Sequence, residues 1–481
     1  MGDSILFSLK KSKLLPAGLV KNPSKWLLII GLLCLANIGL LVESRDSVVS
    51  QEIRREELVQ TYSAALESGN LLTKYAGTGY DDTQSEPVGE FEAAGWTDDL
   101  GVYVVTSVVG IVGIDNLSIN LILRVFAHLV YSISLILCTR IIRRLNLCSS
   151  VAAMSYVVLV NVFVLLVFHA PLGVTLGRNN LYLGSSLCTP FVDCGEVDLF
   201  YGVQSLVVFA SCCALILVAV NGAGQWRRSS GLLVASVIAV AMLFRSDLGI
   251  GLVLLFAFSM FFFNQWKLRR IAMHAVLIYL FSIFLKYLIV TCLYFIRFLQ
   301  SGIPVFEHPQ GHPVWHALYI GLSFNLSGIT QMSSFGVYFQ DNFLYQIVAS
   351  QFPEIVWNSK QYSDIVRSMF FDLVQENPVR FLVQLFTKAG LVLILVAPQV
   401  FMLGLMTKFD IFSRHGFASM RAKLTVVILM LVLSLSFAVG AILVWPSQMY
   451  IPGTIAVLEL MLMIVLFPSF QRILRRINET K

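Results

Sequence analysis

Runs of about 20 apolar residues recur along almost the whole of this chain. A helix that crosses the ~30 Å hydrocarbon core of a membrane needs a run of about that length, because every backbone polar group must be satisfied inside the segment. Of the 481 residues, 57% are hydrophobic and 13% are charged, whereas an ordinary soluble domain has roughly 25% charged residues. The predicted fold class is therefore an all-α polytopic membrane protein.

About ten spans are predicted, at residues 25–43, 118–139, 149–170, 199–220, 230–245, 248–265, 271–296, 382–405, 424–445 and 452–468. Lysine and arginine cluster on alternate connections, from the N-terminal lysines to the arginines at 472–476. By the positive-inside rule, this pattern places both termini in the cytoplasm. We expect an integral protein of a bacterial inner (plasma) membrane. The net charge of +6 does not indicate nucleic-acid binding, because the basic residues lie beside the spans.

The predicted organisation has one membrane domain between two short cytoplasmic tails. The tails cover residues 1–24 and 471–481, and the transmembrane domain covers 25–470. Every long loop falls on the outer side, at 44–117, 171–198 and 298–381.

Two segments of the first loop are expected to be helical. Residues 50–67 read as a soluble helix of mixed charge. Residues 100–115 are apolar but too short to span, so they form either an interfacial helix or an extension of the second span.

Cysteines and nucleotide motifs give little sign of a cofactor. Cys188 and Cys194 lie in the second loop and would form a disulfide if it faces an oxidising compartment. The cysteines inside spans are expected to be small buried hydrophobic residues. No zinc-type CxxC pair, phosphate-binding loop or dinucleotide fingerprint occurs. The cofactor is therefore unknown, no metal site is predicted, and a need for a divalent cation stays open.

Two adjacent acids, Asp98 and Asp99, close the acidic first loop just before the 100–115 segment. Neighbouring residues on a helix point about 100° apart, so these two do not form a facing acid pair. In one interpretation, one carboxylate faces a cavity as a catalytic group and the other caps the helix. In the other interpretation, the acid serves only as a helix cap.

Arg245 and Lys388 are the candidate positive charges at the depth of the lipid headgroups. Arg245 lies between two short spans, and Lys388 lies near the outer end of the eighth span. An ionisable residue within a span is costly and often functional. The alternatives are that Lys388 extends to the interface and that Arg245 pairs with Asp247.

Aromatic and histidine residues of the third loop are candidates for contacts with a substrate. His308, His312 and His316 recur every four residues, but prolines at 309 and 313 oppose a continuous helix and weaken a metal interpretation. Trp315 and Tyr319 suit stacking on a sugar, although an interfacial aromatic belt explains them equally well. Asp341 is a further outer acid.

Several of these segments resemble the GT-C superfamily of integral membrane glycosyltransferases. They are Gly95-Trp96-Thr97-Asp98-Asp99, Leu243-Phe244-Arg245-Ser246-Asp247-Leu248-Gly249, and His312 to Leu322 followed by Phe335-Gly336-Val337-Tyr338 and Asp341. The resemblance implies transfer of a sugar from a polyprenyl-phosphate lipid to a glycan, lipid or protein acceptor. It implies that Asp98 or Asp99, as the acidic residue of the first outer loop, is the general base or the group that orients the acceptor.

The remaining candidates would then bind substrate. Arg245 and Lys388 would contact the carrier phosphate, because a leaving phosphate needs positive charge beside it. His312, Trp315, His316, Tyr319 and Asp341 would shape the acceptor site.

Two other functions remain open from the sequence. An O-antigen-type polymerase or ligase uses similar lipid-linked substrates, but it usually relies on arginines and a histidine of an outer loop rather than on an acid. A lipid or solute transporter without enzymatic activity tends to have two related halves, which this chain lacks.

Overall fold

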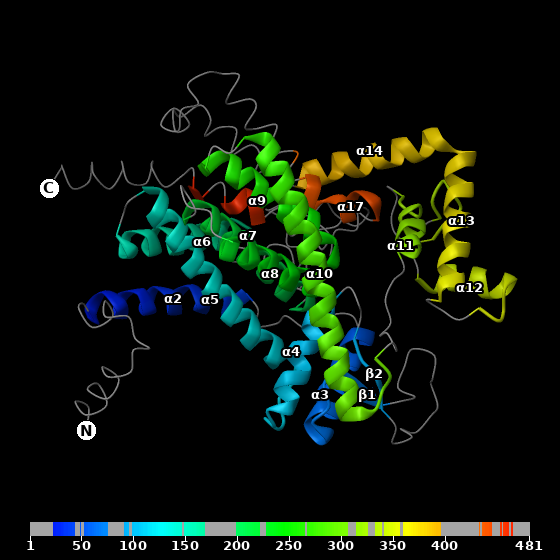
Figure 1. Cartoon of the computed structure of the whole chain (residues 1–481), viewed down its shortest axis with the longest axis horizontal. Coiled ribbons are helices and arrows are strands. Elements are labelled where there is room, and N and C mark those ends of the chain that lie inside the picture. The colour runs from blue at the N-terminus through cyan, green and yellow to red at the C-terminus, as the bar shows by residue number, and fades with distance from the viewer. Residues whose placement is uncertain are drawn as a thin grey trace.

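Helices make up most of the described chain (Figure 1). The computed structural model describes residues 23–43, 49, 52–75, 91–95, 99–146, 149–168, 199–221, 228–264, 267–305, 314–325, 332–338, 341–355, 359–395, 432, 435–444, 453–454, 456–460 and 463–464.

Helices occupy the described parts of eight of the predicted spans. They are α2 (Pro23–Glu43), α5 (Ile119–Asn146), α6 (Ser150–Phe168), α7 (Leu199–Asn221), α8 (Arg228–Phe244), α9 (Gly249–Asn264), α10 (Leu268–Ser301) and α14 (Pro378–Leu395). The short helix α17 (Val439–Leu443) lies in the ninth predicted span.

The number of membrane crossings stays a prediction. Within the described ranges, three helices are long and apolar enough to cross a membrane, namely α5, α7 and α10. Helix α13 (Lys360–Glu376) and α14 form a pair bent by 100°, which would be a fourth span if the pair crosses as one. The structure therefore supports a helical membrane protein but does not test the count of ten.

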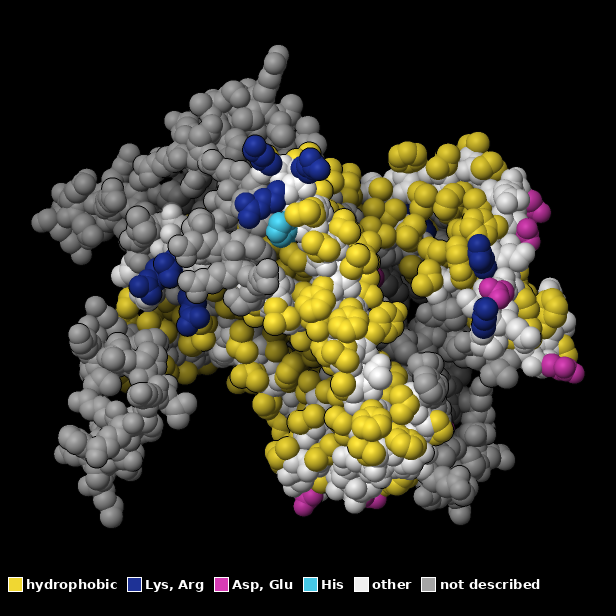
Figure 2. Space-filling view, in the orientation of Figure 1, with side chains coloured by type: hydrophobic (Ala, Val, Ile, Leu, Met, Phe, Trp, Pro, Cys, Tyr) yellow, Lys and Arg dark blue, Asp and Glu magenta, His cyan; other side chains and the backbone are white. Residues whose placement is uncertain are grey.

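Helix α7 lies at the centre of the main hydrophobic core, and α10 lies at its edge. In the most apolar 18-residue window of each helix, 72% of the α7 residues are buried but only 11% of the α10 residues. Because α10 has 34 residues, it is about 51 Å long. Figure 2 shows hydrophobic side chains covering it, with Lys267, Arg269 and Arg270 at its start. Such an apolar outer face suits contact with lipid.

The cysteines only partly follow the expectation of burial. Cys138 of α5 and the adjacent Cys212 and Cys213 of α7 are buried, whereas Cys34 and Cys292 are exposed on their helices. The latter two were therefore predicted wrongly. Cys188 and Cys194 lie outside the described residues.

The segment between the first two predicted spans folds into a small unit of two helices and a two-stranded sheet, here called the α3–α4 unit. It contains α3 (Glu52–Ser68), β1 (Thr73–Tyr75), β2 (Phe91–Ala93) and α4 (Leu100–Ile111). The strands are antiparallel and pair Thr73 with Ala93. The predicted helix at 50–67 is confirmed by α3.

Helix α4 does not extend the second span. The chain takes left-handed backbone conformations at Gly113 (φ +76°) and Asn116 (φ +60°) before α5 begins. A left-handed residue interrupts a right-handed helix, so α4 and α5 are separate, and the extension interpretation was wrong.

Two glycines let α4 fit tightly between its neighbours. A Cβ atom on Gly110 would lie 2.8 Å from the Tyr62 carbonyl oxygen of α3, and one on Gly101 would lie 2.7 Å from the Phe244 ring at the end of α8. These distances are shorter than normal contacts, so a side chain at either position would push α4 away. The glycines therefore fix the start of α4 against the end of α8.

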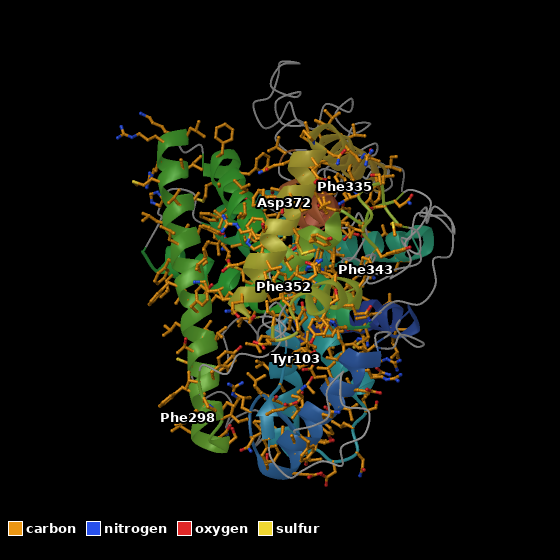
Figure 3. All side chains as sticks on the ribbon, turned by 90° about the vertical axis from the view of Figure 1, so that its right-hand side faces the viewer. Tyr103, Phe298, Phe335, Phe343, Phe352 and Asp372 are labelled. Atoms are coloured by element: carbon orange, nitrogen blue, oxygen red, sulfur yellow. The ribbon has the colours of Figure 1, made fainter. Side chains whose placement is uncertain are left out.

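The segment predicted as the third loop forms a second small unit, the α11–α13 unit, made of α11 (Val314–Gly321), α12 (Asp341–Gln351) and α13. Its own apolar cluster includes Tyr319, Tyr362 and Val366 and is separate from the main core. In Figure 3, Phe335 and Phe343 of this part of the chain lie in the upper half of the view, well above Tyr103 of α4.

Candidate functional site

Asp99 occupies the N-cap position of α4, but its side chain accepts no capping hydrogen bond. Its carboxylate instead accepts hydrogen bonds from two other elements. Arg54 Nη1 of α3 lies 2.5 Å from Oδ2, and Gln204 Nε2 of α7 lies 2.7 Å from Oδ1. The interpretation of Asp99 as only a helix cap was therefore wrong. Asp98 lies outside the described residues.

The Arg54–Asp99 ion pair is largely shielded from solvent. The two side chains are 11% and 10% exposed. The Arg54 guanidinium also lies 4.7 Å from the centre of the Phe200 ring of α7, at a distance typical of a cation–π contact. Because an unpaired charge in this position is expensive, each partner depends on the other. Asp99 is thus a buried carboxylate joined to three helices.

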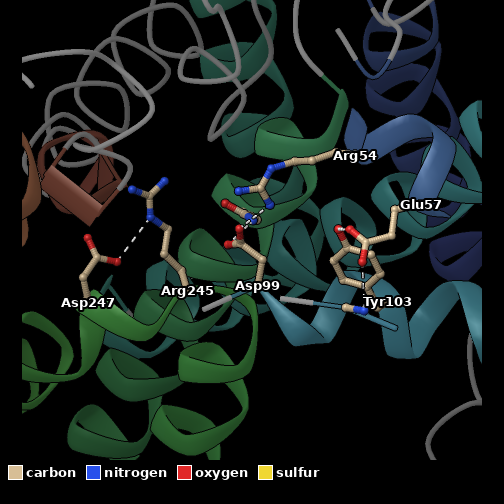
Figure 4. A network of polar contacts seen from close by, with 8 residues as sticks. Arg54, Glu57, Asp99, Tyr103, Arg245 and Asp247 are labelled. Carbon is tan, nitrogen blue, oxygen red and sulfur yellow. Dashed lines mark hydrogen bonds and ion pairs between the residues drawn. The ribbon is translucent and has the colours of Figure 1, made fainter. Parts of the chain in front are cut away.

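A second polar contact joins α3 to α4 one helical turn further along each helix (Figure 4). The Tyr103 hydroxyl donates to Glu57 Oε2 at 2.9 Å. Residues 54 and 57 share one face of α3, and residues 99 and 103 share one side of α4. Burial, together with the nearby Glu57 carboxylate, raises the pKa of Tyr103 well above its ordinary value. The phenol therefore stays protonated and remains a donor.

Glu57 also contacts the chain just before Asp99. Its Oε1 accepts a hydrogen bond from the Gly95 backbone N–H at 3.3 Å and lies 3.7 Å from Lys74 Nζ. Gly95 has φ +100°, a conformation that favours glycine. Glu57 is therefore satisfied by a phenol, an amide and an ammonium group, as a buried carboxylate requires.

Arg245 lies at the end of α8, next to the short 3₁₀ helix η1 (Ser246–Leu248). It is 7% exposed, and its Nε lies 3.3 Å from Asp247 Oδ1. The predicted alternative, in which Arg245 pairs with Asp247, is thus confirmed. The contact of Gly101 with Phe244 brings the starts of α4 and η1 together, and in Figure 4 Arg245 lies to the left of Asp99 and Arg54 lies above it.

Lys388 lies in a different part of the molecule from Asp99. It is 1% exposed, and its ammonium group donates to three backbone carbonyls at 2.6 to 3.3 Å: those of Gly321, Leu443 and Val444. These carbonyls end α11 and α17, where a cation is favourable. The structure does not support the predicted contact of Lys388 with a phosphate, because the ammonium group already donates to three carbonyls inside the protein.

The aromatic candidates of the third loop belong mainly to the core of the α11–α13 unit. His316 is fully buried, and its Nδ1 lies 2.6 Å from the Tyr362 hydroxyl. Tyr319 is 5% exposed, so neither of these two side chains is open to an acceptor sugar. Trp315 is half-buried, with the Arg367 guanidinium 5.3 Å from its ring.

Two predicted site residues remain, namely His312 and Asp341. His312 lies outside the described residues, and Asp341 is the first residue of α12. The structure therefore brings Asp99 and Arg245 together and places Lys388, Trp315, His316 and Tyr319 elsewhere.

Sequence reasoning missed three partners in the Asp99 cluster, namely Arg54, Glu57 and Gln204. A signal existed for Gln204, because it is the one amide inside the apolar run 199–220, and polar residues in such runs commonly hydrogen-bond to neighbouring helices. Arg54 and Glu57 stand in a charged helix among similar residues, so their sequence gave no sign of which ones face α4.

The arrangement suits acceptance of a proton beside a negatively charged group. A carboxylate has about four lone-pair positions, and Arg54 and Gln204 use one on each oxygen of Asp99. Arg245 supplies positive charge nearby. No group of three or more His, Cys, Asp or Glu residues in the described part of the chain could hold a metal ion.

Comparisons of the chain with known proteins give no further guide to this site. No protein-family model, no curated protein and no solved structure matches the sequence.

Proposed function

We propose that this protein is an inverting membrane glycosyltransferase that moves a sugar from a polyprenyl-phosphate or polyprenyl-pyrophosphate lipid to a glycan, lipid or protein acceptor. The observation that carries the proposal is the buried Asp99 carboxylate, held at the start of α4 by Arg54 and Gln204. The packing of Gly101 on Phe244 adds Arg245 to the same region. A base and a positive charge therefore lie where a soluble unit meets apolar helices.

The proposed reaction uses these two charges in different roles. The acceptor hydroxyl oxygen attacks the anomeric carbon opposite the leaving group, and the bond from that carbon to the carrier phosphate breaks. Asp99 takes the hydroxyl proton, and Arg245 stabilises the charge on the departing phosphate. Lys388 has no role in this reaction.

The distribution of charge supports an outer location for the site. Figure 2 has lysine and arginine gathered over the start of α10 and at the left of the view, whereas the bottom shows acidic side chains and the right-hand part shows both kinds. Under the positive-inside rule, the first of these sides is cytoplasmic. The α3–α4 unit is at the opposite end of α10 (Figure 1), which fits chemistry on the extracytoplasmic face of a bacterial inner membrane.

The test compares lipid extracts and surface glycans from cells that lack the protein and cells that carry single variants. Asp99→Asn keeps the shape and removes the base, so transfer should fall by roughly 10²–10⁴-fold and the lipid-linked donor should accumulate. Asp115→Asn is the matched control, because Asp115 is exposed in the turn after α4. An Asp98→Asn arm separates the two adjacent acids. Normal glycans in the Asp99→Asn cells would overturn the proposal.

A further inference from the structure

Glu57 holds both ends of the segment that contains Asp99. Its carboxylate accepts one hydrogen bond from Gly95, four residues before Asp99, and another from Tyr103, four residues after it. Asp99 lies between Gly95 and Tyr103, and its side chain makes no capping hydrogen bond. Its position therefore depends on these two contacts of Glu57 as well as on its own bonds with Arg54 and Gln204.

The residues that form these contacts are more buried than those of a solvent-exposed contact. Glu57 is 7% exposed, Tyr103 is fully buried, and Lys74 is 6% exposed. Burying a carboxylate is unfavourable unless several donors satisfy it. The gathered donors come from the α4 side chain, the loop backbone and strand β1, so Glu57 connects all the parts of the α3–α4 unit that surround Asp99.

Glu57 and Arg54 lie on the same face of α3, and both contact the segment that contains Asp99. Arg54 binds the carboxylate of Asp99 directly, and Glu57, three residues later, binds the Gly95 backbone before it and the Tyr103 side chain after it. Without Glu57, Arg54 and Gln204 would still attract the carboxylate, but the start of α4 could shift along α3. A shift of about 1 Å at a catalytic group can reduce a rate by about 10²-fold.

We infer that Glu57 is a positioning residue for Asp99, which it serves through Gly95 and Tyr103 without touching the substrate. The inference rests on the proposed function. It adds that correct placement of Asp99 depends on the buried carboxylate of Glu57, which acts through its hydrogen bond with the Tyr103 hydroxyl.

The chain supplies a matched control on the same helix. Glu67 of α3 accepts a hydrogen bond from the Tyr75 hydroxyl, so it repeats the carboxylate–phenol pair. Glu67 is exposed, and it has no contact with the 95–103 segment among the described interactions. Glu67→Gln therefore reproduces the chemical change of Glu57→Gln without disturbing the contacts of Glu57 with Gly95 and Tyr103.

The experiment measures steady-state transfer in membranes, using as donor the lipid that accumulates in Asp99→Asn cells. Glu57→Gln and Tyr103→Phe should each lower kcat by roughly 10–100-fold and leave KM within about twofold. Amide hydrogen exchange of the 95–103 segment should quicken in both variants and stay unchanged in α7. Glu67→Gln should match the wild type in every measurement.

Three results would separate the possible failures. A wild-type kcat in Glu57→Gln and Tyr103→Phe, with Asp99→Asn inactive, would overturn the positioning role and leave the proposed function standing. Normal transfer in Asp99→Asn as well would remove the proposed function itself. A fall in kcat that only tracks the loss of folded protein, with unchanged exchange in the folded fraction, would show that Glu57 is structural. Tyr103→Phe keeps the charge and tests the inference even if Glu57→Gln does not fold.

Discussion

The ion pair between Arg54 and Asp99 should be strongly coupled in stability, and a double-mutant cycle tests this. Both side chains are about one-tenth exposed, with Nη1 and Oδ2 2.5 Å apart. Arg54→Met leaves the Asp99 carboxylate with the Gln204 amide as its remaining side-chain partner in the described part of the chain, so it should cost about 3–5 kcal/mol. Asp99→Asn should cost less, because Arg54 keeps its contact with Phe200.

The double variant Arg54→Met/Asp99→Asn removes both charges and should be less destabilised than the sum of the single variants, by about 2 kcal/mol or more. The free energy of unfolding would be measured by denaturant titration in mild detergent. Arg55→Met is the control, because Arg55 is adjacent but exposed, and it should change stability by no more than about 0.5 kcal/mol. A coupling below about 0.5 kcal/mol, the value of a surface pair, would refute the description of this pair as buried.

Two further predictions concern a close packing contact at Gly101 and the buried hydrogen bonds of Lys388. Gly101→Ala should destabilise the protein and lower transfer, since the new Cβ would lie 2.7 Å from the Phe244 ring, whereas Gly31→Ala in α2 meets nothing within 4 Å and should be neutral in a thermal unfolding assay. Lys388→Met should reduce stability by roughly 1–3 kcal/mol, because buried carbonyls lose their donor, and should speed hydrogen exchange at the end of α11. An increase in KM for the donor lipid without loss of stability would instead restore the predicted phosphate contact of Lys388.

The helices were predictable because their signals are local. Hydrophobic run length located α2 and α6 to α9 to within about two residues at each end, and the mixed-charge pattern of 50–67 located α3. Run length placed the ends of α5 and α10 too early, at 139 instead of 146 and at 296 instead of 301. The sequence left open whether α4 is separate from α5, because the break depends on the left-handed conformations of Gly113 and Asn116, which the sequence permits without requiring.

The site was predictable only in part because its contacts are between distant residues. Asp99 was identified from its place in the chain, yet its partner Gln204 is 105 residues away. The expected role of His316 was wrong for a related reason. A four-residue repeat cannot tell a histidine that faces solvent from one that hydrogen-bonds to Tyr362 in a small core.

The Asp99 cluster also has an order in which it can be built during synthesis. Arg54 and Asp99 are 45 residues apart and both lie between α2 and α5, so they can meet as soon as α4 has been made. Gln204 belongs to α7, which is made much later. The carboxylate therefore has a partner of opposite charge before the remaining membrane helices arrive. Each later helix then docks against a pair that is already neutralised rather than against a bare acid.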